Sequence, residues 1–384
     1  MSFFSNQQKL HEILVNYRRE LHEYPELSRQ EFQTTQRIRK WLQAHQIDIV
    51  EYPSLSTGVI AQIVGKIEGP MIALRADIDA LPIHEETGLA FTSQNTGVMH
   101  ACGHDFHTAA IFGAAILLNE RKEELQGTVR IIFQPAEETA QGAIDIVDAG
   151  VLDGVEAIFG FHNKPDLPVG TIGIKSGALM ASVDRFEIDI QGVGGHAGMP
   201  QNSVDPIVVG SAIVSGLQHI ISRELNPFHN IVISTTRFQA GNTWNVIPDK
   251  AELEGTVRTF QNEARDLIPS LMKRKVEGIA TAFGATVDFR WFPYLPVVDN
   301  DPKFYDILTQ TAQELNYTVV EAKPSPGGED FALYQMKIPG FFVWVGVEGP
   351  RQWHHPSYVL NEDALLVAAN YFANVAQNIL QQWK

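Results

Sequence analysis

Hydrophobic residues along the N-terminal part of the chain switch repeatedly between helical and strand-like spacing. Two helices are expected at the start, and Ser28 with Glu31 forms a capping-box pattern for the second. Strands are predicted at four apolar runs, Gly58–Lys66, Met71–Ala76, Thr128–Phe133 and Val155–Phe161. Helical patterns are found at Asp105–Lys122 and Thr139–Ala149. Buried strands that alternate with helices indicate an α/β fold, with a largely parallel sheet and helices on both faces.

The middle of the chain follows a different pattern. Phe186, Ile188 and Ile190 alternate with polar residues, which predicts a strand with one solvent-exposed face. Asp205-Pro206 caps a helix that runs to about Arg223. The remaining elements are strands Ile231–Phe238 and Lys250–Phe260, helix Asn262–Phe283, and a strand in which Val287, Phe289 and Trp291 alternate with other residues. This β-α-β-β-α-β order predicts an inserted ferredoxin-like α+β domain.

The α/β pattern resumes after Pro293. It predicts a helix at 301–315, strands at 317–321 and Gly340–Val347, and a final helix from Asn361. We therefore expect a discontinuous catalytic α/β domain, residues 1–181 and 292–384, that carries an inserted domain, residues 182–291.

Composition narrows the class of protein. The 384 residues are 44% hydrophobic and 19% charged, with a formal net charge of −16, so nucleic acid and anionic membranes are not expected as partners. No segment approaches the roughly 20 apolar residues that span a bilayer, and the first six residues do not resemble a signal peptide. A single cysteine, Cys102, excludes an internal disulfide. Cytoplasmic residence is the expectation.

Residues that can bind metals follow the predicted strands. Asp77 and Asp79 end one strand, Glu137-Glu138 follows another, and His162 follows a third. The carboxyl ends of strands in open α/β sheets are where sites assemble. Further candidates are His100, Cys102, His104, His107 and, near the C-terminus, His354 and His355. Any one histidine alone is more often a surface or hydrogen-bonded core residue, and a Glu-Glu pair usually starts a helix. Their joint occurrence favours a site for a borderline metal.

Seven motifs in order carry a resemblance over nearly the whole chain. They are Arg75–Pro82 (RADIDALP), Met99–Asp105 (MHACGHD), Gln134–Glu138 (QPAEE), Gly195–Ala197 (GHA), Asn245–Pro248 (NVIP), Gly255–Arg258 (GTVR) and Gly327–Phe331 (GGEDF). The sequence resembles the metallo-aminoacylase and carboxypeptidase family. It is most similar to the amidohydrolase branch with hippurate hydrolases, N-acetyl-diaminopimelate deacetylases and plant auxin-conjugate hydrolases.

The resemblance implies a two-metal centre with ligands at Cys102, His104, Glu138, His162 and one C-terminal histidine. His354 fits the branch pattern better than His355, because Asn361-Glu362-Asp363 begins seven residues after it. The wider family has His-x-Asp where this chain has Arg75-Ala76-Asp77, so one histidine ligand is lost and Cys102 restores the count. The sequence is compatible with Asp77 as a ligand, as a bridge between the ions, or as a residue that orients a ligand.

Amide hydrolysis at neutral pH needs an activated water, and two divalent ions roughly 3.5–4 Å apart would supply it. A general base must take the proton of that water and deliver it to the leaving amine. Glu137 is placed for this role beside the ligand Glu138, and the resemblance assigns it the same role. Thiolate, imidazole and carboxylate ligands suit zinc, with manganese, cobalt or nickel as alternatives.

Substrate contacts are expected from the inserted domain. Arg258 offers a planar fork for a carboxylate, although a cross-strand ion pair with a glutamate explains it equally well. The resemblance places His196 and Asn245 at the site, often from a partner subunit, and the backbone at Gly328 along the pocket. A homodimer through residues 182–291, or a higher oligomer, is therefore expected.

The sequence thus predicts a metal-dependent amidohydrolase that removes the acyl group from small N-acyl amino acids. The alternative within the same chemistry is a metal-dependent dipeptidase or carboxypeptidase. A cysteine hydrolase with Cys102 as nucleophile is a rival from another class. A non-catalytic small-molecule binder is a third, but it would not need Glu137 beside the ligands.

Overall fold

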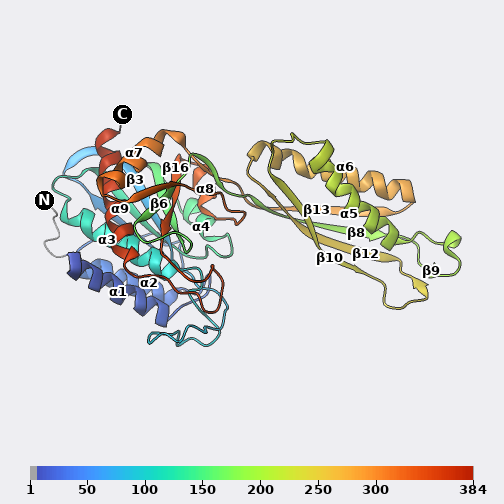
Figure 1. Ribbon diagram of the computed structural model, residues 1–384, viewed down its shortest axis with the longest axis horizontal. Coiled ribbons are helices and arrows are strands. Elements are labelled where there is room, and N and C mark those ends of the chain that lie inside the picture. The colour runs from blue at the N-terminus through green and yellow to red at the C-terminus, as the bar shows by residue number, and fades with distance from the viewer. Residues whose placement is uncertain (1–6, 384) are drawn as a thin grey trace. The chain divides into compact units, whose positions relative to one another are not determined.

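The computed structural model describes residues 7–383, and these form two compact units. The first unit comprises the chain up to Gly177, Asp299–Lys323, and the residues from Glu329 onward. The second unit comprises Ala178–Val298 and Pro324–Gly328. Figure 1 labels many of the helices and strands of both units. The expectation about the first six residues lies outside the described part of the chain. Among the described residues, no helix is both long and apolar enough to cross a membrane.

An eight-stranded sheet forms the centre of the first unit. In spatial order its strands are β1 (Asp48–Val50), β2 (Val59–Val64), β4 (Gln126–Gln134), β3 (Ile67–Asp77), β5 (Val155–Lys164), β16 (Gly340–Gly346), β6 (Thr171–Ile174) and β15 (Thr318–Glu321). The middle strands β4, β3, β5 and β16 are parallel neighbours. All seven residues of β16 are buried, which explains its uninterrupted apolar sequence. The predicted largely parallel α/β sheet is confirmed.

The helices of the first unit cover this sheet. They are α1 (Gln7–Glu23), α2 (Phe32–Ala44), α3 (His104–Glu120), α4 (Gly142–Asp148), α7 (Tyr305–Glu314), α8 (Phe331–Gln335) and α9 (Ala364–Gln382). Helix α3 is buried on all sides from His104 to Leu118, because its sequence is apolar around its whole circumference. It packs against α1, α9 and β3, so its first residue is held deep in the unit.

Two local predictions were wrong. Ser28 and Glu31 do not form a capping box: the N-cap residue of α2, Glu31, makes no side-chain cap bond, and Ser28 Oγ donates to Asp79. The Glu26 carboxylate accepts the first-turn amides of Gln33 and Thr34. Helix α4 begins at Gly142 rather than Thr139. The backbone of Ala136 and Ala140 is left-handed, with φ of +52° and +55°, which no helix can contain. The glutamate pair therefore lies in a loop.

The second unit has a four-stranded antiparallel sheet with the order β10 (Ile231–Ala240), β12 (Lys250–Thr259), β8 (Val183–Gln191) and β13 (Thr286–Leu295). Helices α5 (Pro206–Arg223) and α6 (Asn262–Phe283) pack on it and on each other. The predicted ferredoxin-like arrangement is confirmed. Asp205 caps α5 as predicted, accepting a hydrogen bond from the Ile207 amide at 2.9 Å.

The described residues also form several short strands and 3-10 helices. They are β7 (Gly177–Met180), β9 (Gly195–His196), β11 (Val246–Ile247), β14 (Val298–Asn300), and the 3-10 helices Pro200–Asn202 and Pro302–Phe304. Strands β9 and β11 pair with each other in the second unit, which places His196 opposite Val246.

Candidate metal centre

Parallel strands and the start of α3 bring the candidate ligands to one place in the first unit. Glu138 follows β4, His162 lies near the end of β5, and His104 is the first residue of α3. Gly103 has a φ of +85°, a left-handed conformation that favours glycine. This turn lets Cys102 and His104, two residues apart, direct their ligand atoms to the same point.

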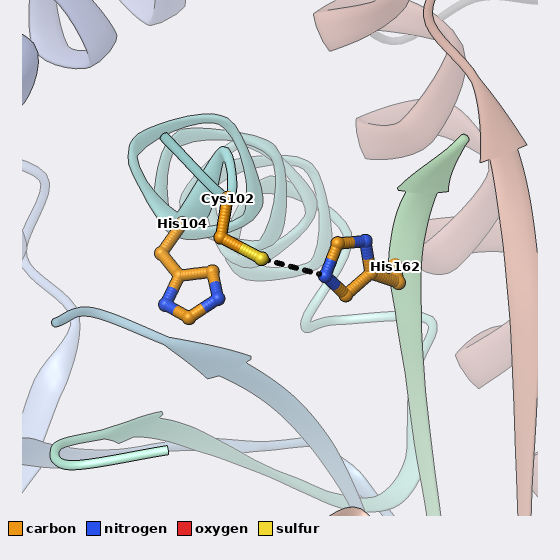
Figure 2. Close-up of side chains that lie close together, drawn as sticks. All are labelled: Cys102, His104 and His162. Atoms are coloured by element: carbon orange, nitrogen blue, oxygen red, sulfur yellow. Dashed lines mark hydrogen bonds between the residues drawn. The ribbon is translucent and has the colours of Figure 1, made fainter. Parts of the chain in front are cut away.

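Cys102, His104 and His162 form the first group of ligand atoms, all within 4.8 Å of one another. Figure 2 shows Cys102 Sγ directed at the His162 ring, 3.3 Å from Nε2. His162 Nδ1 donates to the carbonyl of Asn163 at 2.9 Å, so the proton lies on that nitrogen and Nε2 is the free ligand atom. All three side chains are buried.

Cys102 also belongs to a second group, with Glu138 and His354. His354 Nε2 lies 3.6 Å from Glu138 Oε1, and the His354 side chain is 54% exposed. The His354 backbone is left-handed, with a φ of +64°, and its amide donates to the Ala101 carbonyl at 2.9 Å. The neighbouring His355 instead accepts a hydrogen bond from the Ser357 amide. The geometry thus brings His354, and not His355, to Cys102.

Two buried ligand atoms have no hydrogen-bond partner among the described residues, His104 Nε2 and Glu138 Oε1, and they lie 3.9 Å apart. Asp79 accepts the His104 Nδ1 proton at 3.1 Å, so Nε2 is the ring nitrogen that is left to bind a metal. A buried polar atom without a partner costs about 1–3 kcal/mol. Two such atoms facing the same space fit a site for bound cations, which would give each of them a partner.

The pKa values of three candidate ligands, Glu138, His104 and Cys102, are shifted strongly from their usual values. Burial, and then the charges of Asp79 and Asp77, raise the pKa of Glu138 to about 7. Burial disfavours the cation of His104, but Asp77 and Asp79 outweigh it and raise its pKa to about 10. Burial and the neighbouring carboxylates hold the pKa of the Cys102 thiol well above its usual value. A divalent cation would displace these protons, because metal ligands bind as thiolate, neutral imidazole and carboxylate.

Asp77 lies behind the ligands and both of its carboxylate oxygens are engaged. Oδ1 accepts the His107 Nδ1 proton at 2.6 Å, and Oδ2 accepts from Arg75 Nη1 at 2.7 Å. His104 Nδ1 is farther away, at 3.8 Å from Asp77 Oδ1. This arrangement favours an orienting role for Asp77.

Arg75 occupies the position where the wider family has a ligand histidine. Its guanidinium is fully buried and forms ion pairs with Asp77, Glu329 and Asp330 at 2.7, 2.9 and 2.6 Å. These partners offset the cost of burying the arginine charge. Arg75 thereby joins the end of β3 to the segment before α8, which lies beside Glu137.

Glu137 is partly buried and points at that segment, where the Asp330 amide lies 3.5 Å from its Oε1. Burial, with Glu329 and Glu138 nearby, holds the pKa of Glu137 well above its usual value. A carboxyl group with a raised pKa suits a residue that must accept a proton and then release it. Glu137 also shares a potential cation group with His104 and Glu138.

The predicted substrate residues all lie in the second unit. His196 and Asn245 are exposed, and the Asn245 carbonyl accepts a hydrogen bond from the Ala197 amide. Within the described residues the Arg258 guanidinium forms no ion pair with a glutamate; burial lowers its pKa, and the charge of Asp184 on the neighbouring strand β8 partly offsets this. A Cβ at Gly328 would lie 2.3 Å from Val183, so packing alone requires glycine there. Their approach to substrate stays a prediction.

Sequence reasoning named Asp79 and His107 only as candidate metal-binding residues and did not single out Asn163, but the side chains of all three hold the ligands in place. The available signal was position: Asp79 lies inside the motif Arg75–Pro82, and His107 lies two residues beyond the motif Met99–Asp105. Asn163 had none, since it merely follows His162 on a buried strand.

The chain matches the family model described as Peptidase family M20/M25/M40 over residues 73–378. It belongs to this family. An N-acetylcysteine deacetylase of Bacillus subtilis (strain 168) is 61% identical over 374 residues, which cover 97% of this chain and 98% of the relative. An N-acyl-L-amino acid amidohydrolase of Geobacillus stearothermophilus is 44% identical over 75% of this chain and 78% of its own length.

A solved structure from the M20 family has the same fold throughout. It is a Bacillus subtilis protein described as a dinuclear metal-binding peptidase. The TM-score is 0.90 at 58% identity, covering 97% of this chain and 99% of that one. The family assignment from sequence motifs is therefore confirmed.

Proposed function

We propose that this member of the M20 family is a metal-dependent amidohydrolase that releases the acyl group from small N-acyl amino acids. The observation that carries the proposal is the pair of ligand groups that share Cys102 Sγ, with Glu137 beside them. The relatives named as an N-acetylcysteine deacetylase and an N-acyl-L-amino acid amidohydrolase support the substrate class.

Cys102, His104 and His162 would hold one ion, and Cys102, Glu138 and His354 would hold the other. Zinc suits this donor set, and manganese, cobalt and nickel are compatible with it. When bound, such ions lower the pKa of water and polarise a carbonyl oxygen.

Glu137 performs the proton transfers in this scheme. Its carboxylate accepts a proton from the attacking water as the new C–O bond forms. It then donates that proton to the amine nitrogen as the C–N bond breaks, and a carboxylic acid and a free amino acid leave. Glu138, one residue on, stays fixed as a ligand.

A cysteine-nucleophile mechanism fits the site poorly. Burial and the neighbouring Glu138 and Glu137 raise the pKa of the Cys102 thiol. A nucleophilic cysteine needs the opposite, a positive environment that stabilises the thiolate. Here His162 directs its Nε2 lone pair at the sulfur at 3.3 Å, as a ligand of a shared ion would.

A substrate panel tests the proposed reaction. N-acetyl-L-cysteine, other N-acetyl and N-benzoyl amino acids, and matched dipeptides are incubated with the metal-loaded protein. Release of free amino acid is measured by mass spectrometry. We expect the N-acyl amino acids to be cleaved with higher kcat/KM than the dipeptides. Turnover of dipeptides alone would show that the protein is a dipeptidase or carboxypeptidase.

We further propose a homodimer formed through the second unit. Strand β10 is an edge strand of its sheet, and it exposes Val232 and Phe238 at 51% and 40%. Helix α5 exposes Val208 at 50%. An edge strand with exposed apolar side chains is usually paired or shielded. Pairing across a two-fold axis would cover it and would supply His196 to the partner subunit's site.

Mixing two inactive variants tests this dimer. Glu137→Gln subunits are unfolded and refolded together with His196→Ala subunits. If His196 acts across the interface, one site of each mixed dimer contains both groups, and activity returns. A mixture of Glu137→Gln with Glu138→Gln is the matched control and should stay inactive, because both defects lie in the same half of the site. A mixed dimer of the first pair without activity would refute the trans arrangement.

A further inference from the structure

Asn163 is a fully buried asparagine that follows His162 on β5. Its side chain lies between the segments that carry the assigned metal ligands. We propose that Asn163 is a positioning residue that fixes the relative placement of Cys102, His162 and His354 before any metal binds. This inference rests on the proposed metal-dependent function and explains how its ligands are held.

The amide nitrogen of Asn163 faces two acceptors. Nδ2 donates to the Cys102 carbonyl at 2.7 Å and to His107 Nε2 at 2.9 Å. The backbone N–H of Asn163 donates to the same His107 nitrogen at 2.9 Å. Because a backbone amide is always a donor, His107 Nε2 carries no proton, and Nδ1 must donate its proton to Asp77. Asn163 thus fixes the tautomer of the histidine that orients Asp77.

The amide oxygen of Asn163 faces two donors on the loop that carries His354. Oδ1 accepts from Trp353 Nε1 at 2.9 Å and from the Tyr358 hydroxyl at 2.5 Å. An indole nitrogen can only donate, so the amide cannot be turned round. These two residues flank His354, and the loop is therefore tied to β5 on both sides of the ligand.

The backbone of Asn163 and the glycine in the Cys-Gly-His turn complete the arrangement. The Asn163 carbonyl accepts the Nδ1 proton of His162 at 2.9 Å. A Cβ on Gly103 would lie 2.5 Å from Asn163 Nδ2, so a side chain there would push the amide away from the Cys102 carbonyl. Every segment with a ligand, except the one with Glu138, is thus bound directly to this one residue.

Aspartate at this position keeps the shape of the side chain but loses its donors. A carboxylate would direct lone pairs at the Cys102 carbonyl and at His107 Nε2. Partners of this kind behind metal ligands are worth about 10–100-fold in metal affinity. Asn163→Asp is therefore expected to weaken binding of both ions, because Cys102 Sγ is common to the two groups.

The test compares metal affinity with the stability of the metal-free protein. Zn²⁺ and Co²⁺ are titrated into stripped wild type and Asn163→Asp in competition with a chromophoric chelator, and the unfolding temperature of each metal-free protein is recorded. Asn300→Asp is the matched control. Asn300 is another buried asparagine of the first unit, and it donates to the Lys175 and Phe342 carbonyls at 2.9 and 2.8 Å, away from the ligands.

We expect Asn163→Asp to lower the affinity at least about tenfold, while Asn300→Asp lowers only the unfolding temperature. Wild-type affinity in Asn163→Asp, or an equal loss in Asn300→Asp, would overturn the positioning role. If Asn163→Asp does not fold, Tyr358→Phe removes a single donor to Oδ1 and should weaken chiefly the ion held by His354; unchanged affinity would overturn the role. Wild type that binds no second ion would instead contradict the proposed function.

Discussion

Replacing Glu137 by glutamine is expected to reduce kcat by about 10²-fold or more, the usual contribution of a positioned general base. The amide keeps the size of the side chain but cannot accept the proton of the attacking water. Metal content should stay at the wild-type value, since Glu137 is not among the residues grouped around Cys102 Sγ. Steady-state kinetics and elemental analysis on the same preparation measure both quantities.

The matched control is the same substitution one residue later. Glu138→Gln removes the carboxylate whose Oε1 lies 3.6 Å from His354 Nε2 and 3.9 Å from His104 Nε2. It should lose metal together with activity. If Glu137→Gln loses metal and Glu138→Gln keeps it, the two roles are exchanged.

Sequence patterns predicted the elements whose burial follows a simple period. The buried stretches of β3, β4, β5 and β16 are largely apolar because these strands lie in the middle of the sheet. The alternation in Phe186, Ile188 and Ile190 follows from one packed face in a four-stranded sheet, and the ferredoxin-like order was correct as a result.

Local predictions were wrong where side chains form hydrogen bonds to residues near the site and not to the nearby helix. Ser28 and Glu31 have the spacing of a capping box, but Ser28 bonds Asp79 and Glu31 accepts the amide of Ala136 at 2.8 Å. The bond from the Ala136 amide to Glu31 helps hold Ala136 in its left-handed conformation. Helix α4 therefore begins only at Gly142, and the glutamate pair lies in a loop. Local spacing cannot reveal such contacts, because the partners are 51 and 105 residues away.

The candidate site was predictable to the level of its motifs and no further. The motifs contain most of the residues that the structure places around Cys102. The seven-residue spacing between His354 and Asn361 favoured His354 over His355. The role of Asn163 and the bond between Asp77 and His107 depend on hydrogen bonds between segments far apart in the chain, which leave no local pattern. The substrate residues of the second unit remain predictions for the same reason.

Metal removal is expected to have the largest effect of all, the complete loss of hydrolysis. Without cations, two buried ligand atoms, His104 Nε2 and Glu138 Oε1, have no partner within the described chain. The raised pKa values of His104 and Glu138 favour their protonated forms, which cannot bind metal. Neither water activation nor polarisation of the carbonyl is then available. Because protons and metal compete for the same atoms, chelation should succeed most readily at mildly acidic pH.

The most direct test is therefore acetate release from N-acetyl-L-cysteine by one preparation in three states: as isolated, stripped by chelator, and reloaded with a defined divalent metal. The account predicts that activity disappears with the metal and returns in proportion to metal content, reaching its plateau at two ions per subunit, as in a dinuclear relative. Full turnover by protein shown to be metal-free by elemental analysis would contradict it.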